Sequence, residues 1–106
     1  MANDITEGGG NVFADLGFPD AADRQTKTRL AMAVNGLIKE RRLKQTHAAE
    51  VLGIPQPRVS ALANYRLDHF SVEKLMSFLN ALDHDVEIVI RPSRESGGHT
   101  RVRALT

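Results

Sequence analysis

Residues 45–62 read QTHAAEVLGIPQPRVSAL, and this stretch decides the fold. Its first half is typical of a short helix that ends at Gly53, because glycine readily adopts the left-handed conformation of a helix cap. Pro55 and Pro57 then fall where a second helix would start, and proline is tolerated there because the first amides of a helix have no intrahelical partner. The stretch therefore predicts helices over residues 45–52 and 56–64, joined by a tight turn.

Small and apolar residues in this stretch predict how the two helices pack. Ala49 is small enough to let the helices approach closely. Ile54, Val59 and Leu62 would then fix the second helix on the first. This arrangement is a helix-turn-helix, in which the outer face of the second helix is free to enter the major groove of DNA.

Polar residues at both helix starts have side chains suited to DNA. Gln56 can make a bidentate contact with adenine, and Arg58 can contact either guanine or a phosphate. Gln45, Asn64 and Arg66 could hold phosphates and set the register, although solvated helix residues are the alternative for the glutamines. The predicted DNA-binding residues are Gln45, Thr46, Gln56, Pro57, Arg58, Ser60, Asn64 and Arg66.

Over residues 28–82 the chain resembles the Xre and lambda-repressor-like helix-turn-helix family. The resemblance is carried by Gln45, Ala49, Gly53, Gln56, Val59, Ser60, Leu62 and the Phe70-Ser71 start of a fourth helix. It implies that Gln45 and Gln56 contact operator DNA. The chain departs from the family pattern at Lys44, Pro55 and Pro57, where polar or capping side chains are usual, and these changes bear on base preference rather than on the fold.

A longer pattern is similar to the HigA-type antitoxin subgroup of this family. It comprises NVFADLGFPDA at residues 11–21, ANYRLDHFS at 63–71 and DVEIVIRP at 85–92. The resemblance implies a protein that neutralises a small ribonuclease toxin and represses its own operon. A free-standing Xre-type regulator with no toxin partner is the alternative.

Outside the motif, the pattern predicts a mainly α-helical, lambda-repressor-like domain of four to five helices. Leu30, Val34, Leu37 and Ile38 recur at helical spacing and predict a first helix over residues 21–42. Ser71 is a suitable cap for a helix over residues 72–81, which has a broad apolar face. An apolar arm precedes these helices and would pack on the core, clamp a dimer or touch a partner protein; it consists of Val12, Phe13, Leu16 and Phe18.

Residues 85–91, DVEIVIR, alternate apolar and polar side chains and predict one half-buried β-strand. A lone strand has no ladder partner in its own chain, and unpaired backbone groups are costly. We therefore expect the strand to pair with its copy in a homodimer through Val86, Ile88 and Ile90. The folded domain is expected over residues 11–91, between flexible tails at 1–10 and 92–106.

The net charge of +1 conceals a basic middle. Nine Lys and Arg residues stand against two Glu residues between Arg24 and Arg66, which gives this segment about +7. Such a segment suits a polyanion such as double-stranded operator DNA, or is simply a solvated helix surface.

Other classes of function lack support in the sequence. There is no cysteine, the four histidines are scattered, and there is no nucleophile motif, glycine-rich phosphate loop or aromatic platform for single-stranded RNA. We therefore expect neither an enzyme nor an RNA-binding module, and no metal or cofactor. The absence of cysteines, of an apolar run long enough to span a membrane and of a signal peptide favours a cytoplasmic protein with no membrane partner.

Overall fold

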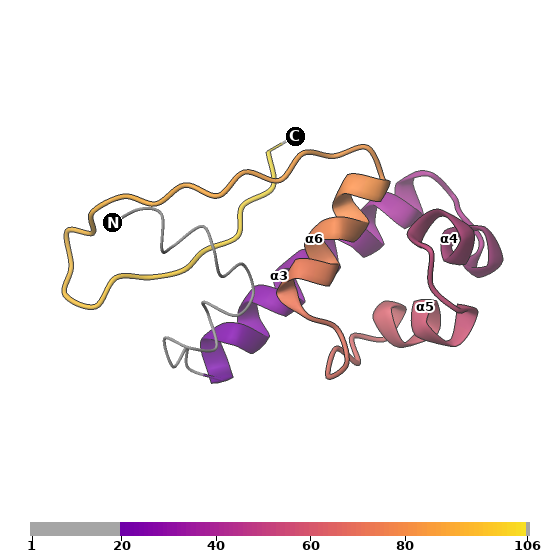
Figure 1. Ribbon diagram of the computed structural model, residues 1–106, viewed down its shortest axis with the longest axis horizontal. Helices are drawn as coiled ribbons and strands as arrows, with labels where there is room; N and C mark the ends of the chain where they lie inside the picture. The colour runs from indigo at the N-terminus through magenta and orange to yellow at the C-terminus, as the bar shows by residue number, and fades with distance from the viewer. Residues whose placement is uncertain (1–19, 106) are drawn as a thin grey trace.

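The computed structural model describes residues 20–105, with side chains described from residue 23 onward. Within this range the chain forms four helices: α3 (Asp20–Glu40), α4 (Gln45–Leu52), α5 (Gln56–Ala63) and α6 (Val72–Ala81) (Figure 1). The mainly helical fold is confirmed. The predicted apolar arm (Val12, Phe13, Leu16, Phe18) and the predicted tail at 1–10 lie outside the described residues. None of the described helices is long and apolar enough to cross a membrane.

The core forms where α3 packs against α6 (Figure 1). Leu30 and Val34 are buried at a spacing of four residues, so they lie on the same face of α3. Phe70, just before α6, and Phe78 of α6 are buried and meet edge to face, with ring centroids 5.9 Å apart. The buried cluster consists of Leu30, Ala31, Val34, Leu52, Leu62, Leu67, Phe70, Leu75, Phe78, Leu79 and Leu82.

The helix bounds follow the sequence closely except at two C-terminal ends. The predicted spans of α4 and α6 are confirmed, and the Ser71 hydroxyl caps α6 by accepting a hydrogen bond from the Lys74 amide at 3.0 Å. The first helix was expected to reach residue 42, but α3 ends at Glu40 because Arg42 adopts a left-handed conformation, with φ of 56°. The third helix ends one residue before the predicted residue 64, which serves as its C-cap.

Two side chains of the α3 region tie the other helices to it. The Asn35 amide donates a hydrogen bond to the Leu62 carbonyl at 3.0 Å, near the end of α5. The Arg41 guanidinium donates to the Leu82 carbonyl and lies 3.6 Å from the Asp83 carboxylate, just beyond α6. A cation at a helix C-terminus complements the partial negative charge there. These contacts fix the orientation of α5 and α6 on the longest helix.

After α6 the chain runs outward in an extended form, turns and comes back toward α3 (Figure 1). Residues 85–91 form no strand within the described part of the chain, because no backbone ladder pairs with them there. Val86, before the turn, and Val102, after it, are partly buried against the core. The strand and its pairing in a dimer therefore stay predictions.

Candidate nucleic-acid interface

The first turn of α4 presents two of the predicted DNA-binding residues to solvent. Gln45 and Thr46 are both exposed, while Ala48 and Leu52 on the opposite side of the helix are buried. The residue before the helix, Lys44, is extended and its side chain makes no capping hydrogen bond. The amides of the first turn are therefore left without a side-chain cap and can donate to an anion such as a phosphate.

The turn between α4 and α5 is built as the sequence predicts. Gly53 takes a left-handed conformation, with φ of 70° and ψ of 33°, and its amide donates to the Ala49 carbonyl at 2.8 Å. The Ile54 amide donates to the same carbonyl at 3.1 Å, which closes the turn. α4 and α5 then pack against each other, in the two-helix arrangement expected of a helix-turn-helix.

α5 buries one side and leaves the other open, as a recognition helix requires. Val59 and Leu62 are buried in the domain, as predicted. Pro57, Ser60 and Asn64 recur at spacings of three and four residues, away from that buried side, and only Ser60 among them is half-buried. Gln56 is exposed at the first position of the helix. The outer face and N-terminal end of α5 are therefore free to meet a groove.

At the C-terminal end of α5, one of the predicted DNA-binding side chains forms a hydrogen bond within the domain. The Asn64 side-chain amide donates to the Ser60 carbonyl at 2.9 Å, so its NH₂ group already has one acceptor. Tyr65 follows in a left-handed conformation, with φ of 58°, and redirects the chain. Arg66 is exposed just beyond this turn. Of these residues, Arg66 presents a charged side chain that no described ion pair occupies.

The Arg58 side chain contacts other residues of the domain, whereas its residue type had suggested a contact with DNA. Its guanidinium carbon is 4.3 Å from the ring centroid of Phe70, and Nη2 donates to the His69 carbonyl at 3.1 Å. The Arg58 Nε atom is buried and has no hydrogen-bond partner among the described residues. This half-buried side chain therefore links α5 to the segment that precedes α6. No periodicity in the sequence connects residues 58 and 70, so the contact could not have been predicted.

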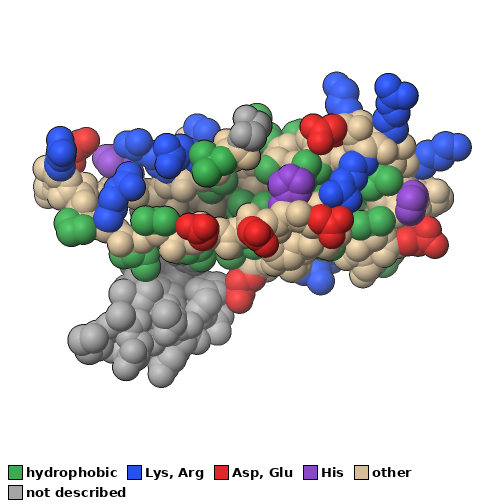
Figure 2. All heavy atoms as spheres, turned by 90° about the horizontal axis from the view of Figure 1, so that it is seen from above, with side chains coloured by type: hydrophobic (Ala, Val, Ile, Leu, Met, Phe, Trp, Pro, Cys, Tyr) green, Lys and Arg blue, Asp and Glu red, His purple; other side chains and the backbone are tan. Residues whose placement is uncertain are grey.

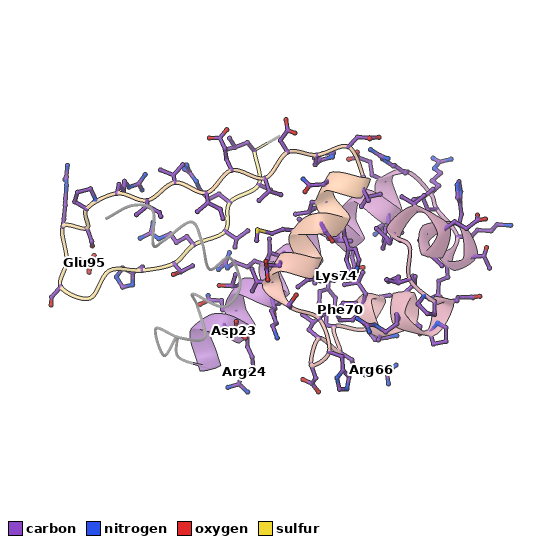
Figure 3. The ribbon with its side chains drawn as sticks, in the orientation of Figure 1. Asp23, Arg24, Arg66, Phe70, Lys74 and Glu95 are labelled. Atoms are coloured by element: carbon purple, nitrogen blue, oxygen red, sulfur yellow. The ribbon has the colours of Figure 1, made fainter. Side chains whose placement is uncertain are left out.

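The start of α3 also lies close to the turn after α5, which the sequence did not indicate. Arg24 and Lys27 line a hollow of about 110 Å³ together with Tyr65 and Asp68. Lys27 is 3.6 Å from Asp23 in the same helix. In Figure 3, Arg24 and Arg66 both extend to the lower edge of the molecule. Arg24 therefore lies near the turn that follows α5, as Arg66 does.

The end of the molecule formed by α4 and α5 carries both signs of charge. Figure 2 shows Lys and Arg side chains there, interspersed with acidic and histidine side chains. Lys39, Arg41, Arg42 and Lys44 are all exposed around the connection from α3 to α4. Four of the nine basic residues of the middle segment thus lie next to the start of α4, and the other five lie elsewhere in the chain.

The predicted dimerisation residues differ in exposure. Val86 is half-buried against its own domain, whereas Ile88 and Ile90 are 65% and 70% exposed. Val89, on the alternate side of the segment, is 68% exposed. Large apolar side chains are thus exposed on both sides of this extended segment.

Comparisons with known proteins agree with this geometry. A family model described as a helix-turn-helix domain matches residues 12–91. A solved structure named as a proposed XRE family transcriptional regulator is 57% identical, with a TM-score of 0.75, over 83% of this chain and 99% of that one. No curated protein matches the chain. The chain is therefore a member of the helix-turn-helix domain family, of the Xre type.

Proposed function

We propose that this protein is a transcriptional regulator that binds double-stranded operator DNA in a sequence-specific manner and represses transcription by occupying a promoter. The observation that carries the proposal is the exposed pair of helix starts at Gln45 and Gln56, held by a closed turn at Gly53. The solved relative named as a proposed transcriptional regulator supports it. The protein acts by binding and catalyses no reaction.

Within this function, α5 is the recognition helix. Gln56 lies at its N-terminal end, where residues of such a helix meet base edges, and a glutamine can make a bidentate contact with adenine. Gln45, with the uncapped amides of α4, contacts a phosphate and sets the register. Thr46, Pro57, Ser60, Asn64 and Arg66 complete the DNA surface, and Arg58 contributes by holding α5 in place.

The active species is a homodimer paired through residues 85–91. Ile88 and Ile90 expose large apolar side chains, and no backbone ladder among residues 20–105 occupies the extended segment, so a second copy could pair with it. Two recognition helices would then enter successive major grooves about 34 Å apart, so the operator is an inverted repeat.

The regulator is also the antitoxin of a type II toxin-antitoxin pair and controls its own operon in the cytoplasm. This part of the proposal rests on the resemblance of residues 11–21, 63–71 and 85–92 to HigA-type antitoxins. A free-standing regulator is the second candidate, and the gene neighbourhood separates the two. Co-expression with an adjacent short gene should yield a co-purifying complex and relieve growth arrest caused by that gene alone. Independent purification of the two products would leave the free-standing regulator.

The DNA-binding part is tested by titrating the purified protein onto the DNA upstream of its own gene, with random DNA of equal length as competitor. Tight binding that survives the competitor supports an autoregulatory repressor. Equal affinity for both DNAs contradicts autoregulation at that site. The titration is repeated at two salt concentrations, because phosphate contacts weaken steeply with salt.

A further inference from the structure

A second cavity lies between the first half of α3 and the returning C-terminal segment. Its volume is about 460 Å³, within the range of cavities that hold small molecules. Its described lining comprises Gln25, Thr26 and Arg29 of α3 and His99, Thr100, Arg101, Val102 and Arg103 of the C-terminal segment. No residue of α4 or α5 lines it, and the C-terminal segment extends at the opposite end of the molecule from those helices (Figure 1).

Three arginines line this cavity, and none of its described lining residues is acidic. Arg29, Arg101 and Arg103 are exposed, and none of them takes part in an ion pair described between residues 23 and 105. No Asp or Glu is among the described lining residues. The Glu95 carboxylate stands at the tip of the segment (Figure 3) and lies 3.6 Å from the imidazole of His99, which lines the cavity. The described lining therefore carries an excess of positive charge, which an anion would neutralise.

The C-terminal segment is anchored at the point where it contributes its two arginines. Val102 is half-buried against the core, directly between Arg101 and Arg103. Arg101 and Arg103, on either side of Val102, both line the cavity. Figure 2 shows Lys and Arg side chains on this half of the molecule as well as on the half that contains α4 and α5. The packing of Val102 against the core thus holds Arg101 and Arg103 at the same cavity as Arg29, which is distant in sequence.

The donors at the cavity fit a phosphate group. Guanidinium groups bind phosphate oxygens through two parallel hydrogen bonds, and several such groups define a site for a multiply charged anion. The Gln25 amide and the Thr100 hydroxyl are further donors. The described lining holds no Phe, Tyr or Trp on which a nucleobase could stack. We propose that this cavity binds a small molecule carrying one or two phosphate groups, held by Arg29, Arg101 and Arg103.

The test is calorimetric titration of the full-length protein with two probes, inorganic pyrophosphate and ribose 5-phosphate, at constant ionic strength. Ribose serves as the uncharged control. Both phosphates should bind saturably with one site per chain, and ribose should not bind. The double variant Arg101→Gln, Arg103→Gln should weaken binding about tenfold or more, because it removes two bidentate contacts. Arg29→Gln, a single change in a stable helix, should weaken binding in the same direction.

A matched control is the double variant Arg91→Gln, Arg94→Gln, which removes the same charge from the same segment but leaves the cavity lining intact. It should keep the wild-type affinity. Equal weakening by both double variants would mean that only net charge matters and would overturn the proposal, as would the absence of saturable binding by wild type. A third outcome would also overturn it: neither probe binds, but the Arg101 and Arg103 variant loses affinity for duplex DNA. Circular dichroism checks that each variant is folded.

Discussion

The guanidinium carbon of Arg58 lies 4.3 Å from the ring centroid of Phe70 and thereby joins α5 to the segment that precedes α6. Phe70 in turn meets Phe78 of α6 edge to face. An arginine held over a buried ring, with a second bond to the His69 carbonyl, is a positioning residue for α5. A base contact by the same guanidinium would have to compete with both interactions.

The Arg58–Phe70 contact should be measurable as a coupling free energy. We expect Arg58→Met and Phe70→Leu each to lower the free energy of unfolding, and the double variant to lose about 0.5–1 kcal/mol less than the sum of the two, the usual magnitude of a cation–π contact. Urea denaturation of the four proteins gives the cycle. Additive losses would show that the stacking contributes no stability.

The same Arg58→Met variant separates positioning from base readout. A positioning residue, when lost, should weaken binding to operator and to random DNA by similar factors, because the whole helix is held less well. Loss of a base contact would instead reduce the preference for the operator by about 1–3 kcal/mol. The two affinities, measured by fluorescence anisotropy, decide between these roles.

The Ser71 cap should matter for stability but not for DNA binding. Its hydroxyl accepts a hydrogen bond from the Lys74 amide at 3.0 Å and caps α6, and Ser71 is not among the predicted DNA-binding residues. Ser71→Ala should therefore lower the free energy of unfolding by about 1 kcal/mol, while Ser71→Asp should keep most of it. Thermal unfolding with a DNA titration on the same samples provides the check. A large loss of DNA affinity in a folded Ser71→Ala protein would contradict this assignment.

Sequence patterns predicted the elements whose signals are local. Gly53, Pro55 and Ser71 marked helix ends through backbone conformation or capping, and the structure places helix boundaries at all three. The end of α3 was placed two residues too far because Arg42 takes a left-handed conformation that its residue type does not announce. Capping and turn residues therefore predicted the turn between α4 and α5 more accurately than the C-terminal end of α3.

Contacts between residues far apart in the chain could not be predicted from the sequence. Asn35 bonds to Leu62 across 27 positions, and Arg58 stacks on a ring 12 positions away, so neither follows from a helical or strand period. The exposure of Gln45 and Gln56 followed from the motif, but the use of Arg58 inside the domain did not. The pairing predicted for residues 85–91 depends on a second chain, which one sequence indicates only through an unpartnered apolar pattern.

Arg66 should act on affinity rather than on specificity. It is exposed beyond the end of α5, beside the hollow that Arg24 and Lys27 line. If it contacts a phosphate, Arg66→Gln should weaken binding to all duplex DNA alike and reduce the salt slope of log affinity by about one. Titrations at several salt concentrations measure the slope. A selective loss for the operator would place Arg66 at a base instead.

The exposed isoleucines should hold the dimer together. The double variant Ile88→Thr, Ile90→Thr keeps β-propensity but removes apolar surface from the predicted pairing face, so it should shift the protein to monomer. The control, Val89→Thr with Glu87→Thr, changes the other side of the same segment and should remain dimeric. Light scattering over a concentration series reports the mass. A dimer that persists in the first variant would place the interface elsewhere.

The central claim, that α5 reads DNA sequence through its N-terminal end, is tested most directly by the ratio of random-DNA to operator-DNA Kd. Gln56→Ala should reduce this ratio by a factor of about 5–150, which corresponds to 1–3 kcal/mol for a good bidentate base contact. Gln25→Ala removes the same side chain from an exposed site on α3 and should leave the ratio unchanged. An unchanged ratio in Gln56→Ala, with the fold intact, would contradict the assignment of α5 as the recognition helix.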